Sequence, residues 1–199
     1  MVENKRQKQK ELTRRHLIEI AIQQFGENGI TTTRSADIAK IAKVSHGTIF
    51  VHFRAQEDLL LAVVEEFGIR IAQRLHELID TNSSLIEVLE AHIIGLTEFE
   101  PFYTRLVIER RLLPESVRNT YIMIQSTISF HIGIAAEKEM EQGIIRQIPL
   151  HLIYNTWIGL IHYYITNGDL FCSSGSVLKQ HWQELFQHYI SLITIPPQI

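Results

Sequence analysis

The side chains with the clearest chemical pattern lie in the segment 45–52. On a short helix, the outward positions of this segment carry short polar or compact residues, namely Ser45, His46, Thr48, Val51 and His52. Groups of this size can hydrogen-bond the edges of DNA bases, because the major groove is about 12 Å wide and admits one α-helix. Gly47 leaves its backbone uncovered and allows close approach to a phosphate. The segment is therefore a candidate DNA-reading helix.

Such a helix needs neighbours that hold it in place, and the flanking residues supply them. The sequence predicts one short helix from about Arg34 to Ala42 and a second from about His46 to His52, joined by residues 43–45. Two short helices with so brief a connection form a helix-turn-helix. Ala39 is small where the two helices must approach closely. Three apolar residues can point inward to hold the second helix: Val44, Ile49 and Phe53.

Helical periodicity also dominates the rest of the chain, and alternating strand patterns are nearly absent. Hydroxyl caps, prolines in first turns and glycines after last turns mark the boundaries of these helices. The pattern predicts an all-α fold of about nine helices. Besides the two short ones, they run from about Lys8 to Asn28, Gln56 to Leu78, Leu85 to Phe99, Pro101 to Leu113, Pro114 to Gln142, Pro149 to Asn167, and Val177 to Ile195 before Pro196-Pro197.

Charge is distributed unevenly along the 199 residues, whose formal net charge is -3. Residues 1–56 contain ten Lys and Arg and five Asp and Glu, whereas residues 57–199 contain nine Lys and Arg and 17 Asp and Glu. The N-terminal segment thus carries +5 and the remainder -8. A basic head attracts phosphate backbones and an acidic body is repelled by them, which predicts a boundary near residue 56. A solvated helical face that binds nothing would carry the same charges, so charge alone leaves both alternatives open.

Other classes of protein find little support. Cys172 is the one cysteine, which excludes an intramolecular disulfide and favours a reducing, cytoplasmic setting. The N-terminus is polar rather than signal-like, and no apolar run is long enough to predict a membrane span. Cys172 with Asp169 matches no nucleophile motif, and His181 and His188 lie two helical turns apart, too far to share an ion unaided. We therefore expect no enzyme, no metal and no cofactor.

Several landmarks occur together in the N-terminal third and resemble the DNA-binding domain of TetR-family transcriptional regulators. They keep the order and spacing of that domain over about residues 10–65, and comprise the segments 17–25, 33–39, 42–53 and 57–60 together with Gly29. The resemblance implies a helix-turn-helix domain, residues 1–56, followed by a helical ligand-binding and dimerisation domain, residues 57–199. It also implies a homodimer on a palindromic double-stranded DNA operator, released by a small-molecule effector, and most often a repressor.

The resemblance carries over to individual residues. Ser45, Gly47, Thr48 and His52 match DNA-contacting positions, and Thr33 and Ser35 match the phosphate-contacting start of the second helix. Three positions depart from the common pattern: His46 replaces Lys, Phe50 replaces Tyr, and Ala55-Gln56 replaces Ser-Lys. The expected DNA-binding set is Thr33, Ser35, Ser45, His46, Gly47, Thr48, Phe50, Val51 and His52. The N-terminal arm either adds phosphate or minor-groove contacts or is disordered; its basic residues are Lys5, Arg6, Lys8, Lys10, Arg14 and Arg15.

In the body, apolar stripes at helical spacing suggest a dimer interface and a ligand cavity. The expected dimer contacts are Ile153, Trp157, Leu178, Trp182, Leu185, Phe186, Tyr189 and Ile193. The expected lining of an apolar or aromatic effector site is His92, Leu96, Phe99, Phe102, Tyr103, Tyr121, Ile124, Ile128, His131, Trp157, Ile161 and Tyr164. Each stripe could instead be intramolecular core, and the whole chain could be a helical ligand-binding or signalling module without specific DNA binding.

Overall fold

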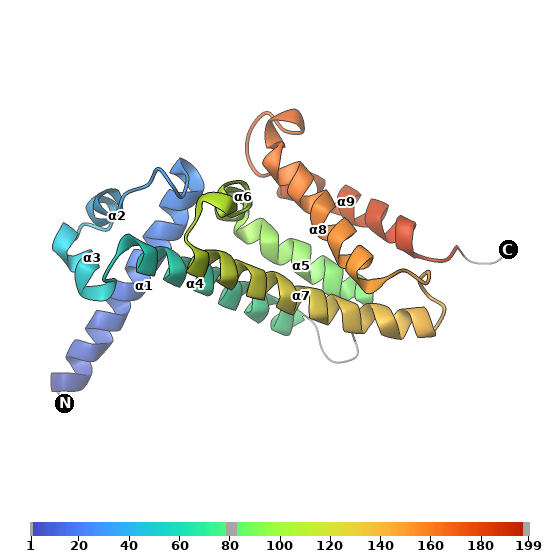
Figure 1. Cartoon of the computed structure of the whole chain (residues 1–199), viewed down its shortest axis with the longest axis horizontal. Coiled ribbons are helices and arrows are strands. Elements are labelled where there is room, and N and C mark those ends of the chain that lie inside the picture. The colour runs from blue at the N-terminus through green and yellow to red at the C-terminus, as the bar shows by residue number, and fades with distance from the viewer. Residues whose placement is uncertain (1, 79–82, 197–199) are drawn as a thin grey trace. The chain divides into compact units, whose positions relative to one another are not determined.

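The computed structural model describes residues 2–78 and 83–196, and within these ranges the regular structure is helical (Figure 1). Two single 3₁₀ turns, Arg110–Leu112 and Gly168–Leu170, interrupt the connections. None of the described helices is both long and apolar enough to cross a membrane. The α-helices are α1 (Val2–Asn28), α2 (Ser35–Ile41), α3 (His46–His52), α4 (Gln56–Leu78), α5 (Leu85–Glu98), α6 (Glu100–Glu109), α7 (Glu115–Glu141), α8 (Leu150–Thr166) and α9 (Val177–Ile193).

The predicted helices are confirmed, with differences of two or more residues at three ends. Helix α1 begins at Val2 rather than near Lys8, because residues 3–9 favour helix by propensity and carry no apolar stripe that periodicity could detect. Helix α6 ends at Glu109, after which the chain tightens into a 3₁₀ turn. Helix α9 ends at Ile193, two residues before the predicted end. Pro197, predicted to stop it, lies outside the described residues.

The chain forms two compact units. Unit 1 comprises Met1–Gly68 and Pro101–Tyr121, and unit 2 comprises Ile69–Glu100 and Ile122–Ile199, in both cases as far as the residues are described. Helices α4 and α7 each contribute residues to both units. The predicted boundary near residue 56 therefore differs from the division by packing, because the first half of α4 and most of α6 pack with the N-terminal helices.

Aromatic stacking and one close helix approach build the core of unit 1. The Phe67 ring of α4 stacks on Tyr103 of α6 with centroids 5.4 Å apart and meets Phe102 edge-on at 5.7 Å. A Cβ atom at Gly26 of α1 would lie 3.0 Å from the Phe102 nitrogen and 3.1 Å from the Pro101 Cβ. A larger residue there would push α1 and α6 apart by a few tenths of an ångström, so glycine favours this close approach.

Unit 2 is built around helices α8 and α9, which lie side by side (Figure 1). The Trp157 ring of α8 is fully buried and its centroid lies 5.0 Å from that of Tyr189 on α9. The Trp157 indole N–H donates to Nδ1 of His92 on α5 over 3.1 Å. Tyr154 of α8 donates its hydroxyl to Gln125 of α7. These contacts tie α5, α7 and α9 to α8.

Two buried glutamates of unit 2 accept hydrogen bonds from helix N-termini. Glu100 accepts from the backbone N–H groups of Val177 and Leu178, over 2.7 and 3.0 Å, where α9 begins. Glu139 of α7 accepts from the Leu85 N–H over 2.8 Å, where α5 begins. Carboxylates stabilise these helix starts because the first N–H groups of a helix have no intrahelical partner.

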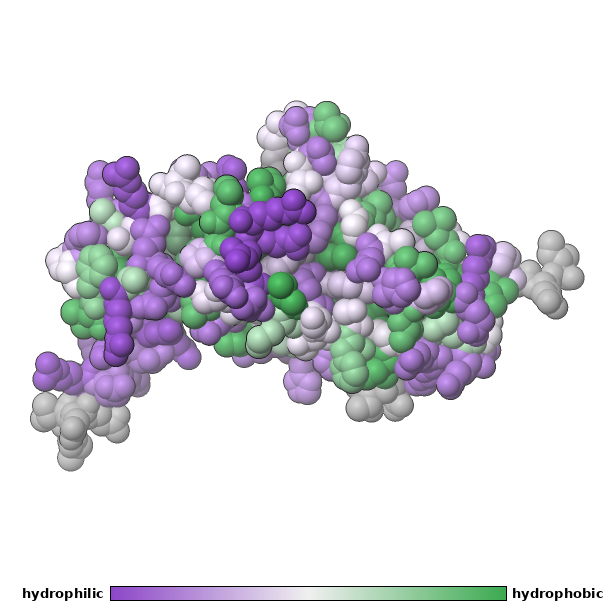
Figure 2. Space-filling model, in the orientation of Figure 1, coloured by the Kyte–Doolittle hydropathy of each residue, from purple (hydrophilic) through white to green (hydrophobic). Residues whose placement is uncertain are grey.

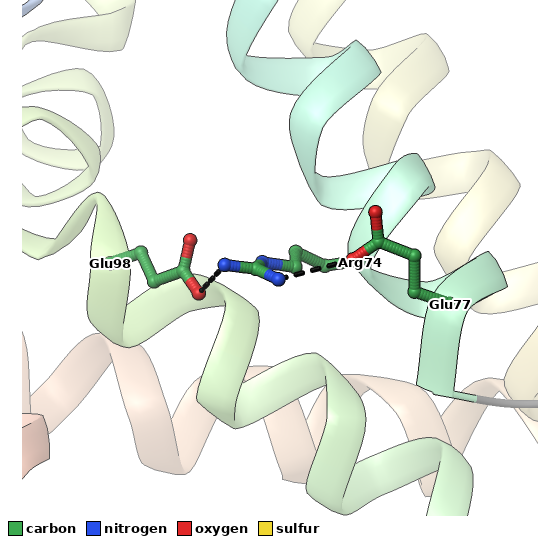
Figure 3. A network of polar contacts seen from close by, with 3 residues as sticks. All are labelled: Arg74, Glu77 and Glu98. Carbon is green, nitrogen blue, oxygen red and sulfur yellow. Dashed lines mark hydrogen bonds and ion pairs between the residues drawn. The ribbon is translucent and has the colours of Figure 1, made fainter.

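At the surface of unit 2, Arg74 of α4 lies between two carboxylates (Figure 3). Its guanidinium lies 2.8 Å from Glu98 of α5 and 3.1 Å from Glu77. All three side chains are well exposed, so the network contributes little to stability. Hydrophilic residues cover the N-terminal part of α1, whereas hydrophobic ones emerge over α7 and α8 (Figure 2).

Candidate nucleic-acid interface

The turn between α2 and α3 has the predicted helix-turn-helix form. The Val44 N–H donates to the Ala39 carbonyl over 3.0 Å, which closes the turn after α2. Lys43 adopts a positive φ of 56°, a conformation unusual for a residue other than glycine. Ser45 caps α3 by accepting from the Thr48 N–H over 3.2 Å, and its hydroxyl lies 2.8 Å from the Thr48 hydroxyl. This pair fixes the start of α3.

Of the residues predicted to face outward, Ser45, His46 and Val51 are exposed, and Thr48 and His52 are half-buried. His46 and Gly47 are exposed, as are Phe50 (46%) and Val51 (67%), while Ile49 on the opposite side is fully buried. The His46 and Phe50 rings meet edge-on with centroids 5.0 Å apart. The face therefore combines one imidazole and an open backbone with two apolar side chains. Apolar groups of this kind contact thymine methyl groups in the major groove.

Thr33 and Ser35, which match phosphate-contacting positions of the family, are buried in this structure. The Thr33 hydroxyl donates to the Gly29 carbonyl over 2.6 Å, and Ser35 Oγ lies 3.2 Å from His46 Nε2. Gln56 also contributes here, because its amide donates to the Thr33 carbonyl over 2.9 Å. The departure from the family pattern at Gln56 thus joins the start of α2 to the start of α4.

A residue that the sequence gave no reason to select holds the connection between α1 and α2. Glu109 is buried and accepts from the N–H groups of Ile30 and Thr31, over 3.1 and 2.7 Å. It also accepts from the Thr31 hydroxyl over 2.7 Å. Glu109 lies on α6, nearly eighty residues away in the chain, so no local motif could reveal it. Its carboxylate sets the path of the chain into α2.

His52, at the end of α3, is less exposed than the prediction of an outward-facing side chain implies. It is half-buried, and its Nδ1 atom has no accessible surface and no hydrogen-bond partner among the described residues. Burial lowers the pKa of His52, and the nearby charges of Lys10 and Arg14 lower it further. The N-terminal arm is helical rather than disordered, and its residues Lys10 and Arg14 lie near enough to the end of α3 to affect the pKa of His52.

The expected effector residues fall into two groups, one in each unit. Phe102, Tyr103 and Tyr121 belong to unit 1 and are buried there. The others belong to unit 2, but His131 is exposed on α7 and so does not line an interior site. The remaining unit 2 members are His92, Leu96, Ile128, Trp157 and Ile161, all buried, and Phe99, Ile124 and Tyr164, all half-buried.

His92 is the one fully buried histidine among the described residues. Its Nδ1 accepts from Trp157, and its Nε2 has no hydrogen-bond partner in the described part of the chain. Desolvation lowers the pKa of His92 to about 3, with a further contribution from His162. The imidazole is therefore neutral near pH 7, with its proton on Nε2 because Nδ1 is an acceptor.

The structure places most of the predicted dimer contacts in the interior of the single chain. Of the eight residues, seven are buried within the single chain and Trp182 is half-buried, because α8 and α9 turn these apolar stripes toward each other and toward α5. The outward face of α8 carries different residues: Leu152, Thr156, Gly159 and Tyr163.

No group of three or more potential metal ligands lies together in the described ranges. His181 is directed instead toward Glu184 and the Phe171 carbonyl.

Comparison with known sequences gives one family and several relatives. Residues 17–63 match the family described as "Bacterial regulatory proteins, tetR family". The chain is 27% identical over 138 residues to the probable acrEF/envCD operon repressor of Escherichia coli K12, a match that covers 68% of this chain and 54% of that protein. It is 22% identical over 191 residues to the transcriptional repressor KstR2 of Mycobacterium tuberculosis, covering 90% of both. The chain thus spans about half the length of the E. coli relative.

Solved structures share the fold over most of the chain. A TetR-family regulator from Agrobacterium tumefaciens superposes with a TM-score of 0.78 at 18% identity, covering 94% of this chain and all of that one. FadR from Bacillus subtilis, solved in complex with stearoyl-CoA, superposes with a TM-score of 0.72 at 20% identity. The match covers 88% of this chain and 97% of that one. A Saccharomonospora viridis regulator, solved in complex with choline, superposes with a TM-score of 0.73 at 22% identity. The match covers 94% of this chain and 100% of that one.

Proposed function

We propose that the chain is a transcriptional regulator of the TetR family, and that it represses transcription by binding a palindromic operator as a homodimer. A small molecule bound in unit 2 would release it from the operator. The observation that carries the proposal is the short helix α3, capped by Ser45 and presenting His46, Gly47, Phe50 and Val51 to the outside. Proteins of this family regulate transcription and are not enzymes.

A second chain would be needed because one seven-residue reading helix covers only half of a palindromic site. The outward face of α8 supports this contact. Leu152 and Tyr163 are 44% and 57% exposed, and a Cβ atom at Gly159 between them would meet nothing within 4 Å. The surrounding segment 147–168 contains no Asp, Glu, Lys or Arg. Two copies of an otherwise acidic body could approach there without charge repulsion.

The effector would bind in unit 2, beside His92 and Trp157. The buried Nε2–H of His92 is a donor that a ligand carbonyl or hydroxyl oxygen could satisfy. A neutral imidazole offers no positive charge, so this contact favours an uncharged acceptor over a carboxylate. The related folds solved with stearoyl-CoA and with choline bind ligands of very different chemistry, so they support a ligand site but not a particular ligand.

A mobility-shift assay tests the proposal. The protein would be titrated onto DNA fragments flanking its own gene and onto an unrelated duplex, at moderate salt, with its oligomeric state measured in parallel. We expect a specific complex of two chains per site. An intact dimer without a specific shift would favour a helical ligand-binding module without DNA function. Equal operator affinity with and without an identified ligand would exclude release by that ligand.

Replacing Thr48 by alanine is expected to lower operator affinity about 5- to 10-fold, because its hydroxyl pairs with Ser45 at the start of α3. The Ser45 cap on the Thr48 N–H remains, so the melting temperature should change by no more than about 3 °C. Titration with labelled operator and a thermal melt measure the two effects. Thr127→Ala, an exposed threonine on α7, serves as the control. A large loss of stability would show that Thr48 is structural.

A further inference from the structure

Helix α7 carries a row of apolar side chains that are exposed in the single chain. Met123 and Phe130 are 67% and 65% exposed, and Ile134 is 51% exposed. Their spacing of seven and four residues places them in one stripe along the helix, with the exposed Ile122 beside it. Single exposed apolar residues are common on protein surfaces, but a row of this size marks an interaction surface. We call these four residues the α7 face.

The α7 face lies in a stretch of the chain without charged side chains. Between Arg118 and Glu137 there is no Asp, Glu, Lys or Arg, although residues 57–199 carry a net charge of -8. A second copy of this acidic chain would be repelled elsewhere, whereas on the α7 face it meets no like charge. A charged partner would gain nothing from this absence of charge, so the pattern favours a second copy.

The α7 face and the outward face of α8 both belong to unit 2, on helices that contact each other. A Cβ atom at Gly133 of α7 would lie 3.8 Å from the Leu150 Cδ1 atom, at the start of α8. Tyr154 of α8 donates its hydroxyl to Gln125 of α7. On the face of the molecule drawn in Figure 2, hydrophobic side chains emerge over both helices. One partner could therefore cover the two surfaces together.

The size of a stable interface also requires more surface than α8 offers. A standard protein–protein interface uses about 20–30 residues on each side. Helix α8 has six exposed residues, and the segment 122–136 of α7 adds seven more. Polar groups on α8 add little to the cost of burial where they already have partners, as the Thr156 hydroxyl does in donating to the Leu152 carbonyl. Helix α7 thus supplies apolar surface that a contact through α8 alone would lack.

We propose that a second copy of this chain covers the α7 face together with the outward face of α8, so that the α7 faces of the two copies meet. The proposal rests on the homodimer proposed above and adds to it a surface outside α8 and α9. A two-fold axis brings the same patch of both copies together, and an apolar patch without charge is complementary to itself. Its removal from water supplies the favourable free energy of the contact.

Charge placed on the α7 face tests the proposal. Phe130→Asp and Met123→Asp should each raise the dissociation constant of the dimer at least about 100-fold, because a two-fold contact buries the new charge twice and without a partner. Sedimentation velocity over a range of protein concentrations measures this effect. Both side chains are exposed in the single chain, so circular dichroism should show that the variants remain folded. Gln183→Asp is the matched control, because Gln183 is exposed on α9 of the same unit and gains the same charge.

A mixture of two variants tests whether the α7 face meets its own copy. Phe130→Asp and Phe130→Lys should each be monomeric alone, because like charges then face each other. Their mixture should form dimers with one chain of each kind, because opposite charges then lie across the contact. A mixture of folded chains that stays monomeric would overturn the contact between the two α7 faces.

Two further outcomes would also overturn the proposal. The first is dimers of Phe130→Asp and Met123→Asp as tight as the wild-type dimer, while Leu152→Asp on α8 dissociates, because the dimer would then use α8 without α7. The second is an equal weakening by Gln183→Asp, which would show that added negative charge alone separates the acidic chains. A wild-type protein that is monomeric would instead refute the homodimer of the proposed function.

Discussion

Replacing Glu109 by alanine is expected to lower the free energy of unfolding by about 3 kcal/mol, because hydrogen bonds to a charged acceptor contribute roughly 1.5–3 kcal/mol each. The variant would leave the N–H groups of Ile30 and Thr31 without their acceptor, and the Ile30 N–H is buried. For a chain of this size the melting temperature should fall by roughly 10 °C. Operator binding should be lost as well, because the released connection leads directly into α2.

Thermal and urea unfolding, followed by circular dichroism, measure the stability effect, and a mobility shift measures DNA binding. The stability of Glu109→Gln should lie between those of the wild type and Glu109→Ala, because the amide keeps one acceptor oxygen and presents an NH₂ group to the second donor. Glu137→Ala, an exposed glutamate on α7, is the matched control and should change stability by less than about 0.5 kcal/mol. A melting temperature of Glu109→Ala within about 2 °C of that of the control would contradict the role assigned to Glu109.

Acid is expected to destabilise the protein through His92. The unfolded chain binds a proton to this histidine near pH 6.5, whereas burial holds the pKa of His92 in the folded chain at about 3. Because the folded-state pKa is lowered, its contribution to stability is complete above pH 6.5 and is lost as pH falls toward 3. The free energy of unfolding should therefore decrease by about 2 kcal/mol between pH 7.5 and pH 5 from this group.

The variant His92→Asn isolates this effect. Its Oδ1 can replace the imidazole Nδ1 as acceptor for Trp157, while the side chain no longer titrates. We expect the variant to be less stable than the wild type at pH 7.5 but to lose about 2 kcal/mol less on acidification to pH 5. His131→Asn, on an exposed face of α7, should retain the wild-type slope. If the free energy of unfolding changed with pH equally in the wild type and in His92→Asn, the conclusion that His92 is buried and neutral would be refuted.

The N-terminal domain was predictable because its information is local. The bounds of α3, the cap at Ser45 and the inward positions of Ile49 and Phe53 follow from residues within one or two turns of each other. Helix number and most boundaries elsewhere follow for the same reason, since caps, prolines and glycines act on their own helix. The start of α1 was missed because a polar helix without an apolar stripe leaves no periodic signal.

Contacts between distant segments could not be predicted. Glu109 and Glu100 are single acids in amphipathic helices, and nothing in the chain indicates that each accepts hydrogen bonds from a segment more than seventy residues away. The sequence indicated that the apolar stripes of α8 and α9 are buried faces. It did not indicate which segments cover them. Periodicity shows that a face avoids water, and Trp157 does so by packing on Tyr189 of its own chain.

The positive φ of Lys43 has a consequence for motion. A lysine in this conformation costs roughly 1 kcal/mol relative to ordinary helical geometry, and it lies immediately before a helix of only seven residues. Ile49 is the one buried residue of that helix. Short segments with few buried contacts open locally at a lower free energy than the whole protein unfolds. We therefore expect α3 to open locally more readily than the core of unit 1, so that part of the free energy of DNA association would be used to order the helix that reads the sequence.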